Sequence, residues 1–191
     1  MFLDGVPFST PYSGTRLLLA LHPNLKLSKH IEMLDLVYEN QTGNETWTEE
    51  FFRGVLEQAI EYLGLNQSAK GGPAGKVEIG LNLVTLERSQ ELNNQYRHKD
   101  KPTDVLSFPL DEHSLETYGI LPLGDIFICL EVAQKQAQEI NIPLNQELAR
   151  LTVHGLLHLL GHDHERSEAD EKKMIDLQEE ILQAIFKHLN I

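Results

Sequence analysis

The chain has 191 residues, with 29 Asp and Glu against 16 Lys and Arg, and a formal net charge of -13. This excess of acid disfavours a protein that coats nucleic acid by bulk attraction, because neutralising phosphates requires clustered Lys and Arg. A local basic groove is not excluded. The length and a hydrophobic share of 41% predict one well-packed domain rather than two. The lone cysteine, Cys129, excludes a disulfide within the chain and fits a reducing compartment.

The first segment, residues 1–29, contains Pro7, Pro11, Pro23, Gly5 and Gly14 without a sustained hydrophobic period. This composition predicts an irregular N-terminal extension ahead of a domain at 30–191. The apolar stretch within the extension is too short for a signal peptide, and no later stretch reaches the length of a membrane span. We therefore expect a cytoplasmic protein with no membrane partner.

Hydrophobic periodicity divides the rest of the chain into strands and helices. Thr46 with Glu49 resembles a capping box that opens an amphipathic helix, and Gly64 ends that helix. Strict alternation at 77–83 predicts a strand with one solvated face. In chain order, the first half is expected to contain a strand at 34–38, the helix ended by Gly64, the strand at 77–83, and a weaker helix at 87–96.

The second half begins with a strand at 105–108 and a long loop through Pro122. A strand at 125–130 is apolar on both faces and is therefore expected at the centre of the sheet. A helix at 132–140 closes before Pro143, a helix at 148–160 is apolar around its whole circumference, and Ser167 with Asp170 caps a final amphipathic helix. The final helix is predicted from Met174, Leu177, Ile181, Ile185 and Leu189.

These elements predict the α+β class. We expect a single domain in which a small mixed sheet of about four strands packs with about five helices. The helix at 148–160 should lie buried and carry a metal site, forming the floor of a cleft lined by residues 97–108. One sequence does not determine the strand order.

Four of the nine histidines lie within residues 154–164, whose sequence is HGLLHLLGHDH. On a helix, His154 and His158 lie one turn apart on the same face, so both imidazoles can point at one ion. Gly161 can adopt the left-handed conformation that ends a helix and lets the chain bring His164 back toward the pair. Three histidines around zinc leave its fourth position open, as catalytic zinc requires. His162 is an alternative ligand or a lid residue, and His164 is preferred for its spacing.

The same run has the histidine and glycine spacing of the metzincin proteases, H-E-x-x-H-x-x-G-x-x-H. Those enzymes place a glutamate directly after the first histidine as the general base for peptide hydrolysis. Gly155 occupies that position here. Glycine has no proton to transfer, so the sequence does not support peptide hydrolysis by that route.

Three blocks of the sequence match known patterns. Residues 154–164 match H-G-x-L-H-L-x-G-[YH]-D-H, residues 92–109 match L-N-x-x-Y-R-x-x-D-x-P-T-[DN]-V-L-S-F-P, and residues 124–129 match G-D-[IVL]-x-I-[CS]. Together these blocks resemble the YbeY family of metal-dependent ribosomal-RNA maturation endoribonucleases. The resemblance extends over most of the chain from about residue 31. Residues 1 to about 30 precede the family's usual start, which leaves open whether Met33 is the initiator or the extension is genuine.

The resemblance implies one zinc ion per chain, held by His154, His158 and His164, and an arginine, Arg97, that faces the metal cleft. It also implies cleavage of single-stranded ribosomal RNA, in maturation of the 3′ end of the small-subunit, 16S-type RNA and in ribosome quality control. The expected partners are this RNA, the small ribosomal subunit and assembly proteins, and no DNA is expected.

A guanidinium suits the place given to Arg97, because it can bind a phosphate through two hydrogen bonds and counter developing charge. Lys99, Lys101 and Ser107 are candidate substrate-binding residues, although a solvated loop and an ordinary strand explain them equally well. The general base is unassigned: Asp163 is one candidate, and the RNA 2′-hydroxyl could act as the nucleophile instead. A ribosome-assembly factor with a structural metal, and less favourably a peptidase, are the competing hypotheses.

Overall fold

The computed structural model describes residues 34–65, 76–110, 120–162 and 167–191, which contain four strands and five helices. From Leu34 onward these residues belong to one compact unit. The elements in chain order are β1 (Leu34–Asn40), α1 (Glu49–Leu63), β2 (Lys76–Val84), α2 (Leu86–Arg97), β3 (Val105–Pro109), β4 (Ile120–Cys129), α3 (Leu130–Glu139), α4 (Leu144–Leu159) and α5 (Glu168–Leu189). No helix among the described ranges is long and apolar enough to cross a membrane.

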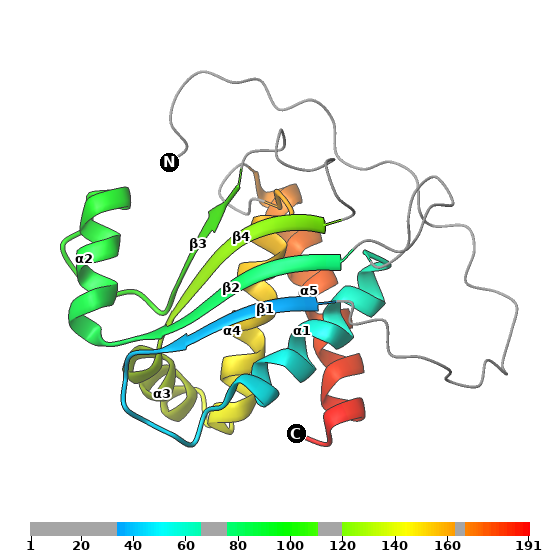
Figure 1. The fold of residues 1–191 in the computed structure, drawn as a ribbon, viewed down its shortest axis with the longest axis horizontal. Helices are drawn as coiled ribbons and strands as arrows, with labels where there is room; N and C mark the ends of the chain where they lie inside the picture. The colour runs from blue at the N-terminus through cyan, green and yellow to red at the C-terminus, as the bar shows by residue number, and fades with distance from the viewer. Residues whose placement is uncertain (1–33, 66–75, 111–119, 163–166) are drawn as a thin grey trace, which may run out of the picture. The chain divides into compact units, whose positions relative to one another are not determined.

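The strands form one mixed sheet in the order β1-β2-β4-β3 (Figure 1). β1, β2 and β4 are parallel, whereas β3 runs antiparallel to β4 and forms an edge. α2 and α3 follow directly at the ends where β2 and β4 finish. The expected α+β class, the mixed sheet and the inner position of the apolar strand β4 are confirmed.

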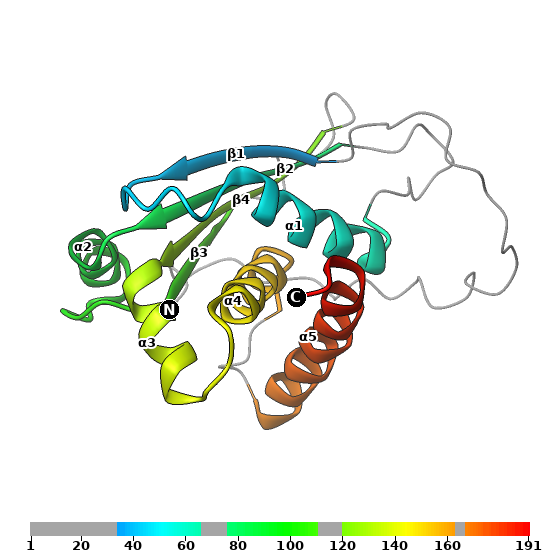
Figure 2. The same cartoon turned by 90° about the horizontal axis from the view of Figure 1, so that it is seen from below.

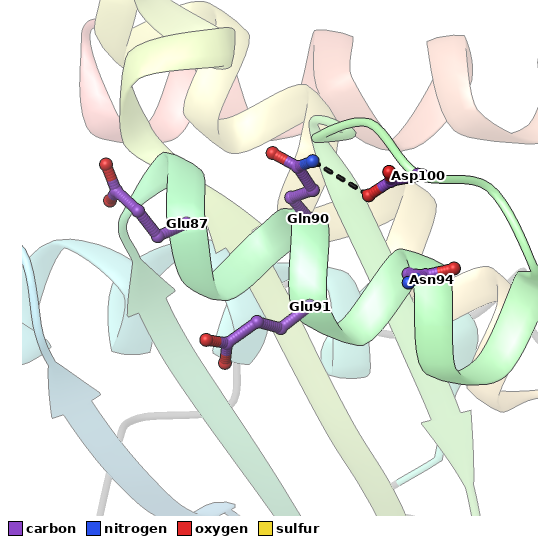
Figure 3. Close-up of a pocket in the computed structure, with 5 residues that line it drawn as sticks. All are labelled: Glu87, Gln90, Glu91, Asn94 and Asp100. Carbon is purple, nitrogen blue, oxygen red and sulfur yellow. Dashed lines mark hydrogen bonds between the residues drawn. The ribbon is translucent and has the colours of Figure 1, made fainter.

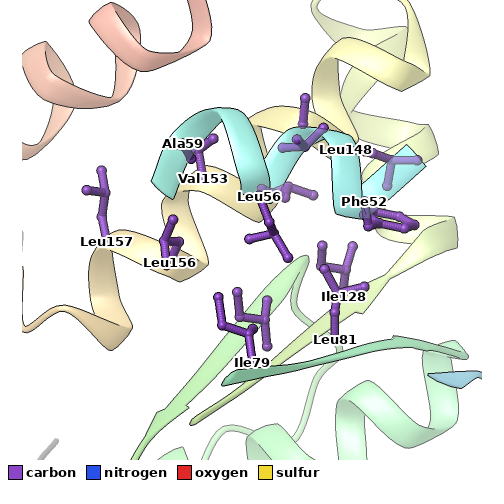
Figure 4. Close-up of a cluster of buried hydrophobic side chains, with 14 of the residues drawn as sticks. Phe52, Leu56, Ala59, Ile79, Leu81, Ile128, Leu148, Val153, Leu156 and Leu157 are labelled. Atoms are coloured by element: carbon purple, nitrogen blue, oxygen red, sulfur yellow. The ribbon is translucent and has the colours of Figure 1, made fainter. Parts of the chain in front are cut away.

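One face of the sheet is covered by α1 and α4, with α5 packed against both helices (Figure 2). Alternate residues of β2 supply the sheet side of this core, and they are fully buried: Val77, Ile79, Leu81 and Leu83. Figure 4 shows Ile79, Leu81 and Ile128 facing α1 and α4 across the core. Because α4 lies between the sheet, α1 and α5, its circumference is apolar, as the sequence predicted.

The start of β4 was predicted wrongly, as part of a loop running through Pro122. The strand begins at Ile120, and Pro122 pairs with Glu78 of β2. Pairing with β3 begins only at Gly124, so the missing N–H of Pro122 faces no ladder on that side. A register shift opposite Glu78 and Ile79 accommodates the extra residue in β4.

The predicted capping box of α1 was also wrong. Thr46 lies in a turn, where its backbone N–H donates to the side chain of Asn44. The helix begins at Glu49, and Thr48 occupies the N-cap position without a side-chain hydrogen bond. Gly64 does end the helix in the left-handed conformation, with φ 67°, as predicted. The cap of α5 is confirmed as well, because Ser167 Oγ accepts from the backbone N–H of Asp170.

A candidate metal centre on helix α4

The histidine pair lies on the single stripe where α4 reaches the protein surface. From Leu151 to Leu159 every residue of the helix is buried except His154 and His158, which are partly exposed. Their four-residue spacing places them one turn apart, as the sequence predicted. The buried neighbours pack this part of α4 into the core, so both imidazoles lie at the boundary between the core and the solvent.

The two rings converge through the same ring atom. His154 Nε2 and His158 Nε2 lie 3.1 Å apart, and the ring planes meet at 75°. Two nitrogens bonded to one zinc ion at about 2.0–2.1 Å lie roughly 3.3 Å apart at the tetrahedral angle. The pair therefore already has nearly the separation that a shared ion imposes, and two neutral imidazoles are ligands suited to zinc.

The chain leaves α4 through the turn that the sequence predicted. Gly161 is left-handed, with φ 84°, and its N–H donates to His158 O while His162 N–H donates to Leu157 O. These two bonds form a Schellman motif, which reverses the chain direction directly after α4, the histidine helix. His162 is partly buried, and burial lowers the pKa of its imidazole.

The third predicted ligand, His164, and the candidate base, Asp163, lie outside the described residues. Among the residues that the structure does describe, no group of three His, Cys, Asp or Glu side chains is placed to hold a metal ion. His154 and His158 are thus brought together as predicted, and the place of His164 in the site stays a prediction.

Gly155 lies on the side of α4 that presses against the sheet. A Cβ atom at this position would lie 2.8 Å from Ile126 Cγ2 and 3.1 Å from Ser107 Oγ. Ile126 belongs to the central strand β4 and is fully buried. A larger residue at 155 would push the helix away from the sheet, so the glycine sets the depth at which the neighbouring His154 sits.

Ser107 lies on the same buried face of β3. Its Oγ atom is buried and has no hydrogen-bond partner among the described residues. The hydroxyl is directed toward the backbone of α4 near Gly155. The structure thus places Ser107 against α4, and its contact with substrate stays a prediction.

Gln178 of α5 contacts the site and was missed in the sequence. Its Oε1 lies 2.9 Å from His154 Nδ1, and the residue is 6% exposed. The sequence signal was present but unused: positions 174, 178, 181 and 185 form the buried stripe of α5, and Gln178 is the polar member of that stripe. A buried polar side chain in an otherwise apolar stripe indicates a specific partner.

Arg97 is the last residue of α2 and is partly buried. The helix ends at His98, which adopts the left-handed conformation with φ 55°. The preceding residue, Tyr96, packs edge-on against Phe108 of β3, with ring centroids 4.7 Å apart. On one face of β3, Phe108 contacts Tyr96 near the end of α2. On the other face, Ser107 lies against α4, the helix that carries His154 and His158.

Lys99 and Lys101 follow α2 in an exposed loop. Two hydrogen bonds hold the backbone of this loop: Lys101 N–H donates to Lys99 O, and the side-chain Nδ2 of Asn93 donates to Lys101 O. Both residues are exposed, which is compatible with phosphate binding and with an ordinary surface loop.

A surface hollow beside α2 is lined by acidic side chains. Glu87, Glu91 and Asp100 line it together with two amides, and Gln90 donates to Asp100 at 2.8 Å (Figure 3). Three carboxylates repel phosphate, so this hollow is unsuited to RNA.

The family model described as endoribonuclease YbeY matches residues 37–186, which include every element that builds the histidine site. The chain belongs to the YbeY family. Its membership extends from β1 to the last turns of α5 and so includes Arg97, both histidines of α4 and Gln178.

The chain matches curated YbeY relatives over most of the length of each relative. The endoribonuclease YbeY of Persephonella marina is 41% identical over 78% of this chain and 92% of the relative. The YbeY proteins of Sulfurihydrogenibium and of Aquifex aeolicus are 46% and 42% identical, each over 70% of this chain and 81% of the relative. A solution structure from Thermotoga maritima is 27% identical, covers 82% of this chain and 92% of its own, and superposes with a TM-score of 0.56.

Proposed function

We propose that this chain is a zinc-dependent endoribonuclease that cleaves single-stranded RNA, with the zinc ion held by His154, His158 and His164. Membership of the YbeY family makes it an RNA-cleaving hydrolase. The observation that supports the metal is the 3.1 Å separation of two Nε2 atoms on the exposed stripe of a buried helix. Three histidine ligands leave a zinc position open for water or for a phosphate oxygen.

Zinc in this place would lower the pKa of a bound water or polarise a phosphate oxygen. The protein's own contribution is positioning and charge. Arg97 would bind the scissile phosphate and stabilise the negative charge that grows on it. Lys99 and Lys101 are exposed in the loop that follows Arg97, and they would bind the RNA backbone on either side of the scissile phosphate.

The biological substrate that we propose is precursor RNA of the small ribosomal subunit, processed at its 3′ end in the cytoplasm. The partners would be the small subunit and its assembly proteins, and the same activity would serve ribosome quality control. The strong net charge of -13 makes broad binding to RNA unfavourable, so recognition is expected to depend on a local site and on the partners.

The test is cleavage of a single-stranded RNA containing the 3′ end of the small-subunit precursor, with a duplex of the same sequence beside it. The wild-type chain should cut the single strand, lose this activity with a chelator, and regain it with added zinc. His158→Ala should abolish both cleavage and stoichiometric zinc. Arg97→Ala should retain zinc and lose cleavage by about 10²- to 10³-fold, the usual effect of removing one charge-stabilising donor.

Two exposed residues serve as controls, an arginine on the same helix as Arg97 and a histidine outside α4. Arg88→Ala removes an exposed arginine of α2 that pairs with Glu91, and His188→Ala removes an exposed histidine of α5. Both variants should cleave RNA as the wild type does. Equal cleavage by the wild type, His158→Ala and Arg97→Ala would indicate a contaminating nuclease. Bound zinc without any cleavage would instead support the assembly factor with a structural metal.

A further inference from the structure

The contact between Gln178 and His154 joins the last helix to the histidine helix. Gln178 Oε1 lies 2.9 Å from His154 Nδ1, inside the range of a good hydrogen bond. The glutamine is almost fully buried, within the apolar stripe formed by Met174, Ile181 and Ile185. A leucine or methionine would fill this position without the need to satisfy an amide.

The direction of this hydrogen bond fixes the protonation of one ring. An amide oxygen only accepts, so the Nδ1 atom of His154 must carry the proton. In the neutral imidazole the other nitrogen, Nε2, then holds a lone pair. Nε2 is the atom that faces His158 Nε2 at 3.1 Å. The glutamine therefore selects the tautomer in which the lone pair of His154 points at the place shared by the two histidines.

We propose that Gln178 is a positioning residue of the metal centre, which sets the tautomer and the ring orientation of His154 for metal binding. This inference rests on the proposed zinc site. Ligand histidines commonly donate their second ring N–H to an oxygen, and loss of that oxygen weakens metal affinity by about 10- to 100-fold. Gln178 supplies the oxygen from a different helix, so α5 becomes part of the site although it contributes no ligand.

The tautomer can be measured without any metal. In metal-free protein, long-range ¹H–¹⁵N correlation spectra separate the protonated and unprotonated nitrogens of each histidine, with His154→Asn identifying the resonances of His154. The wild type should show His154 protonated on Nδ1. Gln178→Leu should shift His154 toward protonation on Nε2 or toward a mixture. Protonation of His154 on Nε2 in the wild type would overturn the proposal, whether or not the chain binds zinc.

The second measurement is zinc affinity by competition with a chromophoric chelator. Gln178→Leu should weaken zinc binding by about tenfold or more. Gln178→Glu keeps an oxygen acceptor toward His154 Nδ1 and should restore the affinity to within about threefold of the wild type. A structural role for the amide predicts no such rescue, because the glutamate buries a charge at the same place.

The control is Leu182→Ala, which creates a cavity one turn further along α5, where Leu182 is 3% exposed. This variant should lower the thermal midpoint of the metal-free protein while leaving zinc affinity within about threefold of the wild type. An equal loss of affinity in Leu182→Ala and Gln178→Leu would show general loosening of α5 and overturn the proposal. Zinc affinity unchanged in a folded Gln178→Leu would overturn it as well. If the wild type binds no zinc, the proposed function fails, and the tautomer measurement still decides the role of Gln178.

Discussion

Replacing Gly155 by alanine tests whether the histidine helix is held against the sheet by the absence of a side chain. The added Cβ would lie 2.8 Å from Ile126 Cγ2 and 3.2 Å from Ile126 Cδ1. Ile126 is fully buried in the central strand, and its branched Cβ leaves it little rotational freedom. The contact can be relieved only by moving α4 outward or by straining the isoleucine.

Two opposing terms decide the sign of the effect. Alanine is favoured over glycine inside a helix by about 1 kcal/mol. Inserting a methyl group into a well-packed contact costs about 1–3 kcal/mol. We therefore expect Gly155→Ala to lower the free energy of unfolding by about 1 kcal/mol, which corresponds to a fall of about 2–4 °C in Tm for a chain of this size.

The assay is urea unfolding of the metal-free protein, with Gly54→Ala as the matched control. Gly54 is also inside a helix, α1, but its added Cβ would meet Leu189 Cδ2 at an ordinary 3.5 Å. Gly54→Ala should therefore stabilise the protein by up to about 1 kcal/mol. Ile126→Val removes the Cδ1 methyl and should cost less in the Gly155→Ala background than in the wild type. Stabilisation by Gly155→Ala equal to that of Gly54→Ala would refute the reasoning.

Three further predictions concern other parts of the chain. Arg150→Met should destabilise the protein by about 3–5 kcal/mol in urea unfolding, because Glu147 is fully buried and its hydrogen bonds raise the pKa of Arg150; a cost below about 1 kcal/mol would contradict this. His98→Gly should stabilise the protein by roughly 1 kcal/mol in the same assay, because His98 has φ 55° at the end of α2, and any loss of stability would contradict this. Cys129 should react with a thiol reagent at neutral pH only when the protein opens, since the residue is 1% exposed and burial also raises the pKa of its thiol; rapid labelling of the native protein would be the contrary result.

Most of the fold could be predicted because hydrophobic period and burial agree along the chain. Alternation in β2 and the apolar circumference of α4 both follow from their place around one core. The two ends of β4 were predicted wrongly, because the local sequence does not show where this strand begins and ends. Pro122 suggests a loop, but it lies beyond the end of β3, where a strand tolerates the missing N–H. Leu130 continues the apolar run of β4, yet it begins α3, because an apolar run carries no boundary signal.

In the site, contacts within one helix could be predicted from the sequence, whereas contacts between elements could not. Spacing within one helix was enough to bring His154 and His158 together, and Gly161 gave the turn that follows them. The contact of Gly155 with Ile126 depends on how α4 packs on the sheet, which a helical period does not encode. Gln178 reaches the site from another helix, so its partner could not be inferred, although its polarity within a buried stripe marked it as unusual.

X-ray absorption at the zinc edge of the zinc-loaded full chain tests the metal centre most directly. Multiple scattering from imidazole rings counts the histidine ligands around the ion. The predicted result is three imidazoles and one oxygen ligand in the wild type, and loss of stoichiometric zinc in His158→Ala. A spectrum with no imidazole scattering, or one left unchanged by His158→Ala, would contradict the proposal that these histidines hold a catalytic metal.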